Sequence, residues 1–106
     1  MLKLMFFLYR RPDLSADDFQ RYSREVHMPL VARVPGLRRY AVSHVTLNPA
    51  GADGACDAVA ELWFDGPEAF QAAVATPEGS AALADQANYL DMERTHMLFV
   101  EETAGL

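Results

Sequence analysis

The segment KLMFFLY at residues 3–9 has large apolar side chains on both faces of the strand that its aromatic and aliphatic composition predicts. Successive side chains of a strand point to opposite faces, so a strand with one solvated face alternates between apolar and polar residues. This segment does not alternate in that way. Its two faces would carry Leu4, Phe6 and Leu8 on one side and Met5, Phe7 and Tyr9 on the other. We therefore expect a sheet that is covered on both faces.

The order of the predicted elements indicates a ferredoxin-like fold. After the first strand, the sequence predicts a helix that begins at Ala16 and ends at the VPG of 34–36, a strand at 37–47, a glycine-rich connection at 48–56, a strand at 57–65, helices at 66–75 and 76–90, and a strand at 95–102. We expect the connection to be mobile, because it has little to bury. This βαββαβ order, with a split second helix, predicts an α+β fold with a four-stranded antiparallel sheet. We expect residues 1–106 to form a single domain.

The first predicted helix has a start signal, one apolar stripe and an internal proline. Ser15 and Asp18 resemble a capping box, which favours a start at Ala16. The stripe recurs at three- and four-residue spacing and consists of Phe19, Tyr22, Val26 and Leu30. Pro29 has no backbone N–H, so we expect the helix to kink there or to restart with Pro29 as its first residue.

The predicted sheet has more apolar surface than two helices can cover. The strand DAVAELWFD at 57–65 repeats the two-faced pattern, with Trp63 on one face and Phe64 on the other. An uncovered face would expose an apolar patch larger than the few hundred Å² that are usual in a soluble monomer. A second copy of the chain is the simplest cover. Two such sheets packed face to face predict a homodimeric α+β barrel.

Composition narrows the classes of function. The 106-residue chain has a net charge of -6 and scattered basic residues, which argues against a nucleic-acid partner. No apolar run approaches the roughly 18 residues that a membrane span needs, and no secretory signal is recognised, so we expect no membrane partner. A single cysteine, Cys56, favours the cytoplasm. The histidines lack metal-ligand spacing, and the chain has no phosphate-binding glycine loop, so we expect neither a metal nor a cofactor.

Four segments carry the most specific local patterns: KLMFFLYRRPDLS at the first strand, FQRYSREVHMPLVARVPGLRRY through the first helix, DAVAELWFD in the third strand and YLDMERTHMLFVEE at the end. Together they resemble the EthD family of small dimeric α+β barrel proteins. The resemblance implies the dimeric barrel and a pocket lined by His27. The family takes its name from a bacterial ether-degradation cluster, and relatives on this fold include cofactor-independent isomerases, polyketide cyclases, dehydratases and monooxygenases. Ser23 departs from the family, which often has tryptophan there, and this implies a pocket of different size or polarity.

We expect one apolar pocket per protomer, between helices and sheet. Its predicted catalytic residues are His27 and Tyr40, and its predicted substrate-binding residues are Phe19, Tyr22, Val26 and Trp63. His27 lies at the edge of the predicted stripe, where it is either a general acid or base or a helix-end residue that bonds the carbonyls freed by Pro29. Tyr40 either polarises a carbonyl or fills the core with its hydroxyl in water.

These residues predict cofactor-free acid/base catalysis, such as isomerisation, dehydration or cyclisation, on a small apolar carbonyl or aromatic compound. The alternative is a non-catalytic accessory protein that sequesters a pathway intermediate, as the resemblance to ether-degradation proteins allows. An enzyme needs a cavity into which His27 and a second polar group point, whereas a binding protein needs only the cavity. The sequence assigns no substrate and no role to His44, Cys56, Asp57 or Asp91.

Overall fold

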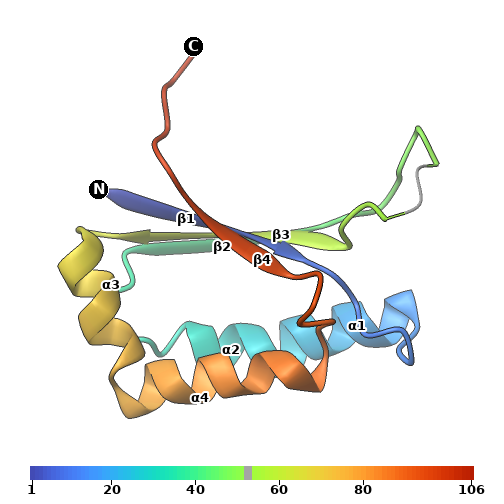
Figure 1. Ribbon diagram of the computed structural model, residues 1–106, viewed down its shortest axis with the longest axis horizontal. Helices are drawn as coiled ribbons and strands as arrows, with labels where there is room; N and C mark the ends of the chain where they lie inside the picture. Colours follow the sequence, from blue (N-terminus) through green and yellow to red (C-terminus); the bar gives the residue numbers. More distant parts are fainter. Residues whose placement is uncertain (52–53) are drawn as a thin grey trace.

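The computed structural model describes residues 1–51 and 54–106 and consists of two layers (Figure 1). One layer is a four-stranded antiparallel sheet in the order β2-β3-β1-β4. Its strands are β1 (Leu2–Leu8), β2 (Arg39–His44), β3 (Ala58–Phe64) and β4 (His96–Val100). The described helices all lie on one face of the sheet (Figure 1). The ferredoxin-like α+β fold expected from the element order is confirmed.

The first helical run is continuous but changes its winding in the middle. It consists of α1 (Ala16–Tyr22), a π-helical turn η1 (Ser23–His27) and α2 (Met28–Val31). As predicted, Ser15 caps its start, since its hydroxyl accepts a hydrogen bond from the backbone N–H of Asp18 at 3.1 Å. The α-helical winding restarts at Met28, with Pro29 as the second residue of α2, so the predicted restart lies one residue from the observed one.

Pro29 explains the π-helical turn. In an α-helix, the N–H of residue 29 would bond the carbonyl of Glu25, but proline has no N–H and its ring crowds that carbonyl. The wider turn of η1 instead brings the N–H of Met28 to the carbonyl of Ser23, five residues back. The insertion of this turn changes which side chains face the sheet.

The buried face of this run differs from the predicted stripe. It follows four-residue intervals through Phe19, Ser23, His27 and Val31. On an α-helix of 3.6 residues per turn such intervals drift by ~40° per step, and the wider π turn offsets that drift. The prediction that Val26 is buried is therefore wrong, because its side chain is 40% exposed. His27 lies within the buried face and not at its edge.

Residues 66–90 form the split second helix. Its parts are α3 (Pro67–Val74), α4 (Pro77–Asp85) and a short 3-10 helix η2 (Gln86–Asn88). Thr76 caps α4, since its hydroxyl accepts a hydrogen bond from the N–H of Gly79 at 3.0 Å. Gly79 is needed at this close approach, because a Cβ there would lie 2.0 Å from the carbonyl oxygen of Ala73. The sharp turn lets α4 pack beside α2 (Figure 1).

The helix-covered face of the sheet holds the hydrophobic core. Sequence alternation left open which face of β1 meets the helices. Two clusters of buried side chains fill the space between the layers, one around Leu8 and Phe19 and the other around Leu4 and Phe64, and Phe6 packs against both. The face that begins with Leu4 is therefore the one that meets the helices.

The opposite face of the sheet lies away from the described helices (Figure 1). It carries Met5 and Phe7 of β1, which lie opposite Glu61 and Val59 of β3. Leu98 of β4 lies opposite Met5 and is 49% exposed. This uncovered face therefore presents apolar side chains from neighbouring strands.

Two segments extend beyond the sheet on its uncovered side. They are the described parts of the connection between β2 and β3 and the residues that follow β4 (Figure 1). The centre of the 48–56 connection, for which the sequence predicts mobility, lies outside the described residues. None of the described helices is long and apolar enough to cross a membrane.

Candidate functional site

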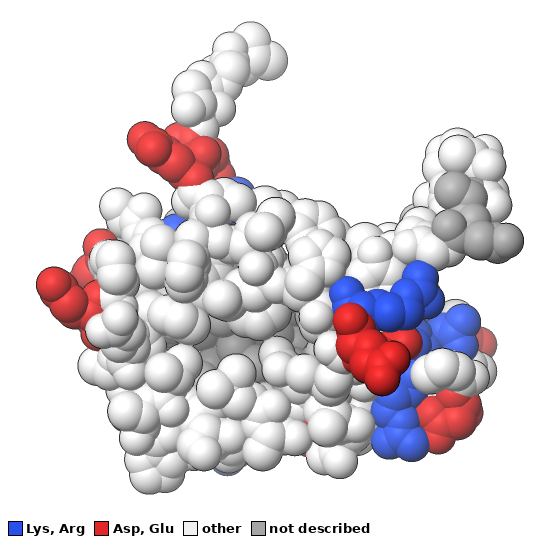
Figure 2. Space-filling model, viewed as in Figure 1, with Lys and Arg blue, Asp and Glu red and all other residues white. Residues whose placement is uncertain are grey.

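A cavity of about 580 Å³, including the part that opens to solvent, lies between the sheet and the helices. Strands β1, β2 and β3 line one side of it, and η1, α2, α3, α4 and η2 line the other. The space-filling view shows a hollow between the two layers, with uncharged residues around it (Figure 2).

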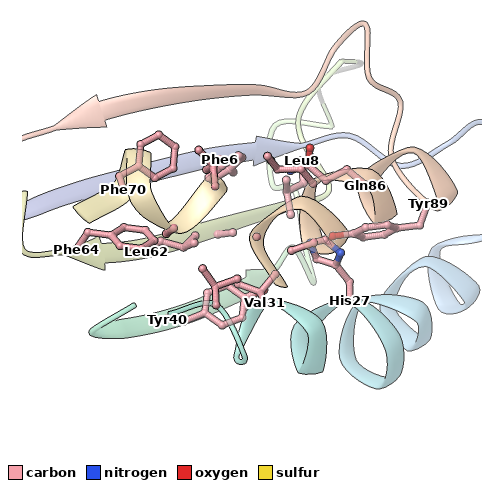
Figure 3. Close-up of a pocket in the computed structure, with 17 residues that line it drawn as sticks. Phe6, Leu8, His27, Val31, Tyr40, Leu62, Phe64, Phe70, Gln86 and Tyr89 are labelled. Carbon is pink, nitrogen blue, oxygen red and sulfur yellow. The ribbon is translucent and has the colours of Figure 1, made fainter. Parts of the chain in front are cut away.

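The cavity wall is mostly apolar. In Figure 3, His27, Gln86 and Tyr89 lie toward one end, and Phe64 and Phe70 lie toward the other. No lysine, arginine or carboxylate side chain is among the described residues that line the cavity. Within residues 1–51 and 54–106, no group of three or more potential metal ligands is placed to hold an ion. The site is therefore an apolar chamber with a few neutral polar groups.

His27 reaches the cavity from the first helical run, and Asp85 of α4 holds its ring. The Nδ1 atom of His27 lies 2.9 Å from Oδ2 of Asp85, and the two side chains are only 8% and 9% exposed. The partner is thus a carboxylate on another helix, and not a carbonyl freed by Pro29. Because Nδ1 makes this contact, Nε2 is the ring nitrogen left for a ligand.

Asp85 is the acceptor for three side chains. Its Oδ1 accepts hydrogen bonds from the Tyr22 hydroxyl at 2.5 Å and from Nδ2 of Asn88 at 3.0 Å, while Oδ2 faces His27. Burial raises the pKa of the Asp85 carboxyl, but the hydrogen bonds from Tyr22, Asn88 and His27 outweigh burial and hold the pKa below its usual 3.8. Asp85 is therefore ionised at neutral pH and accepts the Nδ1 proton of His27.

Burial also decides the charge of His27. It lowers the pKa of the imidazole below its usual 6.5, although the hydrogen bond and the negative charge of Asp85 act in the opposite direction. The ring is therefore neutral at neutral pH. With its proton on Nδ1, the lone pair is on Nε2. A neutral imidazole in this form can act as a general base toward a molecule in the cavity.

Tyr89 lies next to His27 at the polar end of the cavity (Figure 3). Its ring centre is 4.8 Å from that of His27 and 5.1 Å from that of Tyr22, and its other neighbour is Phe19 at 5.5 Å. The side chain is completely buried, and its hydroxyl has no hydrogen-bond partner among the described residues. A buried polar group without a partner is unusual in a folded protein.

Tyr40 of β2 also lines the cavity, as the sequence predicts. Burial raises the pKa of its hydroxyl well above the usual 10, so the group stays protonated and can donate a hydrogen bond. His27 and Tyr40 are thus brought to one cavity from the two layers of the fold.

The other predicted site residues do not line this cavity. Phe19 and Tyr22 lie behind its wall, where Phe19 stacks on Tyr89 and Tyr22 bonds Asp85. Val26 points away, because the π turn rotates it out of the buried face. Trp63 lies on the uncovered face of the sheet, where the ammonium group of Lys3 is 4.9 Å from its ring centre. The prediction that these four residues line the pocket is therefore wrong.

Sequence reasoning missed Asp85, Gln86 and Tyr89. A signal exists for Asp85, because Gly79, Ala82 and Asp85 recur at three-residue spacing in α4 and all three are buried. A carboxylate in such a stripe of small residues indicates a buried ionised group with a partner. The partner itself lies 58 residues away and has no local signature.

Ser23 accounts for the position of His44. The Oγ atom of Ser23 is buried and lies 2.9 Å from Nε2 of His44 on β2. Burial lowers the pKa of His44, and the positive charge of Arg24 lowers it further. His44 therefore pairs with the first helical run at a point outside the described cavity lining.

Comparison with known proteins gives a family match and two named relatives. The family model described as EthD domain matches residues 11–93. An uncharacterized 11.0 kDa protein from the thcB-thcC intergenic region of Rhodococcus erythropolis is 34% identical over 102 residues, which cover 93% of each chain. A 4-carboxymethyl-4-methylbutenolide mutase of Pseudomonas reinekei is 30% identical over 77 residues, which cover 67% of this chain and 71% of the mutase.

Solved structures share the whole architecture. An EthD family protein of Bacillus halodurans has a TM-score of 0.81 and 28% identity, and the match covers 97% of this chain and 99% of that chain. A dimeric ferredoxin-like protein of unknown function from Thermobifida fusca has a TM-score of 0.71 and 21% identity, over 95% of this chain and 90% of that chain. The second similarity supports the fold alone.

Proposed function

The chain belongs to the EthD family, and on that premise we propose that it catalyses cofactor-free acid/base chemistry on a small, mostly apolar carbonyl or aromatic compound, with His27 as the proton carrier. The observation that carries this proposal is the buried pairing of His27 with Asp85 at 2.9 Å, which leaves Nε2 for the cavity. The name of the Pseudomonas relative, a mutase for a butenolide, supports an isomerisation of a lactone.

The proposed reaction begins at a carbon atom next to a carbonyl group. Nε2 of His27 takes a proton from that carbon, and the electrons of the C–H bond move toward the carbonyl oxygen. The imidazolium that forms is stabilised by the negative charge of Asp85. His27 then returns the proton to another carbon of the same delocalised anion. The product is an isomer, and no atom or electron is gained or lost.

The surrounding residues support this role in two ways. The Tyr40 hydroxyl, kept protonated by burial, can donate a hydrogen bond to the oxygen on which negative charge develops. The apolar wall, which includes Phe6, Leu62 and Phe64, holds the hydrocarbon part of the substrate and excludes water. Each electrostatic interaction in the cavity is strengthened by this low local dielectric.

We further propose that two copies of the chain pack through the uncovered face of the sheet. Phe7 stacks on His96 there at 5.1 Å between ring centres, and Leu98 leaves about half of its surface in solvent. The two segments that extend on this side would reach around the edges of a partner sheet (Figure 1). The resulting barrel would have a helical layer, and hence one cavity, on each outer side.

The test of the proposed catalysis uses α-angelica lactone, a small neutral butenolide. Removal of its proton next to the carbonyl and its return at the far end of the dienolate give the conjugated isomer, which absorbs in the ultraviolet. The wild-type protein should accelerate this isomerisation, and His27→Ala should reduce the rate by roughly 10²- to 10⁴-fold, as expected for loss of a general base. His44→Ala is the matched control and should keep the rate.

The outcomes separate the two classes of protein. Equal rates for wild type and His27→Ala would reject His27 as the proton carrier. Saturable binding of the lactone without isomerisation would reject the catalytic proposal for this substrate class and favour a protein that only sequesters its ligand. Circular dichroism of His27→Ala would show whether the folded state is retained.

A further inference from the structure

The Tyr89 hydroxyl is a hydrogen-bond donor that the protein leaves without an acceptor. Its side chain is fully buried, and the hydroxyl has no partner among the described residues. The ring packs between aromatic neighbours, at 5.1 Å from Tyr22 and 5.5 Å from Phe19, so it cannot swing toward another acceptor without disrupting this stack. A buried donor in this condition is unfavourable unless a ligand supplies the acceptor.

The position of the hydroxyl fits a ligand in the cavity. Tyr89 lines the cavity, and Figure 3 shows its ring beside that of His27, both directed toward the space between sheet and helices. The ring centres of Tyr89 and His27 are 4.8 Å apart. A carbonyl oxygen on Tyr89 would therefore place the neighbouring carbon atoms of the ligand within the region that His27 faces.

The charges around the cavity favour an uncharged ligand. None of the described lining residues is a lysine or an arginine, so a carboxylate in the cavity would have no cationic partner. Ionised Asp85 lies directly behind the His27 ring, at 2.9 Å from Nδ1, and would repel an anion placed at Nε2. A neutral carbonyl group needs no cationic partner and is not repelled by Asp85 as an anion would be.

We propose that Tyr89 binds the oxygen of an uncharged carbonyl compound, a neutral ketone, ester or lactone, and that the cavity discriminates against carboxylic acids of the same shape. This inference rests on the cavity of the proposed function but requires no turnover. Burial raises the pKa of Tyr89 well above its usual 10, so the hydroxyl remains a donor at neutral pH. The name of the Pseudomonas relative contains a carboxymethyl group. The uncharged ligand proposed for this chain therefore differs from the compound in that name.

The experiment compares three probes of nearly identical shape. Acetophenone carries a neutral carbonyl, α-methylstyrene replaces its oxygen by a CH₂ group, and benzoate carries a carboxylate. Their dissociation constants are measured by calorimetry at neutral pH for the wild type, Tyr89→Phe and Tyr22→Phe. The decisive quantity is the ratio of affinities for acetophenone and α-methylstyrene, because it isolates the contribution of the carbonyl oxygen.

In the wild type, acetophenone should bind more tightly than benzoate. Tyr89→Phe should lower the acetophenone to α-methylstyrene ratio by about 2- to 12-fold, the usual effect of one neutral hydrogen bond. Tyr22→Phe removes a hydroxyl from the same aromatic stack, but that hydroxyl bonds Asp85, so the ratio should stay at its wild-type value.

Three results would overturn the inference. They are an unchanged ratio in Tyr89→Phe, benzoate binding at least as tightly as acetophenone, and no saturable binding of acetophenone at millimolar concentration. A ratio that falls in Tyr40→Phe but not in Tyr89→Phe would assign the donor to Tyr40 instead. The result is independent of the lactone assay, since binding to Tyr89 can be confirmed in a protein without isomerase activity, and the reverse also holds.

Discussion

Replacement of Asp85 by asparagine changes the buried network while keeping its size. The carboxylate accepts hydrogen bonds from Tyr22, Asn88 and His27 with its two oxygens. An asparagine has one acceptor oxygen and one NH₂ group, which is itself a donor. If the amide oxygen takes the Oδ1 position, the NH₂ group faces His27, which can accept from it only after moving its proton from Nδ1 to Nε2. If the oxygen takes the Oδ2 position, Tyr22 and Asn88 lose their acceptor. The variant therefore destabilises the contact between α4 and the first helical run.

The size of the effect follows from these contacts. A hydrogen bond to a charged group contributes about 1.5–3 kcal/mol, and a buried donor left without an acceptor costs about 1–3 kcal/mol. Because the amide oxygen retains part of the network, we expect Asp85→Asn to lower the free energy of unfolding by about 2–4 kcal/mol. At about 4–8 °C per kcal/mol for a chain of this size, the melting temperature should fall by roughly 8–30 °C.

Thermal melting followed by circular dichroism, at fixed protein concentration, measures this shift. Asp65→Asn is the control, because Asp65 pairs with Arg38 at 2.9 Å on the exposed surface, where such pairs contribute little. A melting temperature of Asp85→Asn within the range of the Asp65→Asn control would refute the view that Asp85 holds the two helical segments together.

Three further predictions concern the buried hydroxyl, the histidine and the sheet faces. Without ligand, Tyr89→Phe should leave the melting temperature unchanged or raise it, because the lost hydroxyl has no partner, and a clear decrease would contradict this. Because burial lowers the pKa of His27 below 6.5, the unfolded chain binds the proton more readily, so stability should fall as pH falls below 6.5. Denaturant titrations should show a smaller fall in the free energy of unfolding for His27→Gln than for the wild type. Equal pH dependence of the two proteins would argue against His27 as the cause. Phe7→Asp should turn a particle of about twice 11.8 kDa into a folded monomer in light scattering, whereas Phe6→Asp should unfold the chain, and the reverse pattern would contradict the assignment of the two faces.

The fold was accessible from the sequence because its signals are local. Strand patterns, the caps at Ser15 and Thr76 and the proline starts of the helices specify the elements, and their order restricts the topology. The sequence did not show which face of the sheet is covered by the helices. Alternation separates Phe6 from Phe7 but does not tell which meets the helices, and the position of Trp63 depends on the same choice.

The candidate site was accessible only in part. His27 and Tyr40 carry polar groups at predicted cavity walls, whereas the place of Val26 depends on a π turn that a regular helical period does not describe. Asp85 follows Gly79 and Ala82 in a stripe of small residues that indicates burial, but its pairing with His27 depends on how α4 packs against the first helical run. Pairings between distant segments therefore limit what the sequence reveals about the chemistry.

The central claim is that His27 is a neutral base whose Nε2 lone pair faces the cavity while Asp85 holds the proton on Nδ1. Long-range proton–nitrogen NMR of the ¹⁵N-labelled protein at neutral pH measures the state of both ring nitrogens. The account predicts that His27 is the Nδ1–H tautomer, with an unprotonated Nε2 signal that shifts when acetophenone is added. A His27 ring that is protonated on Nε2, either as the other tautomer or as imidazolium, would contradict it.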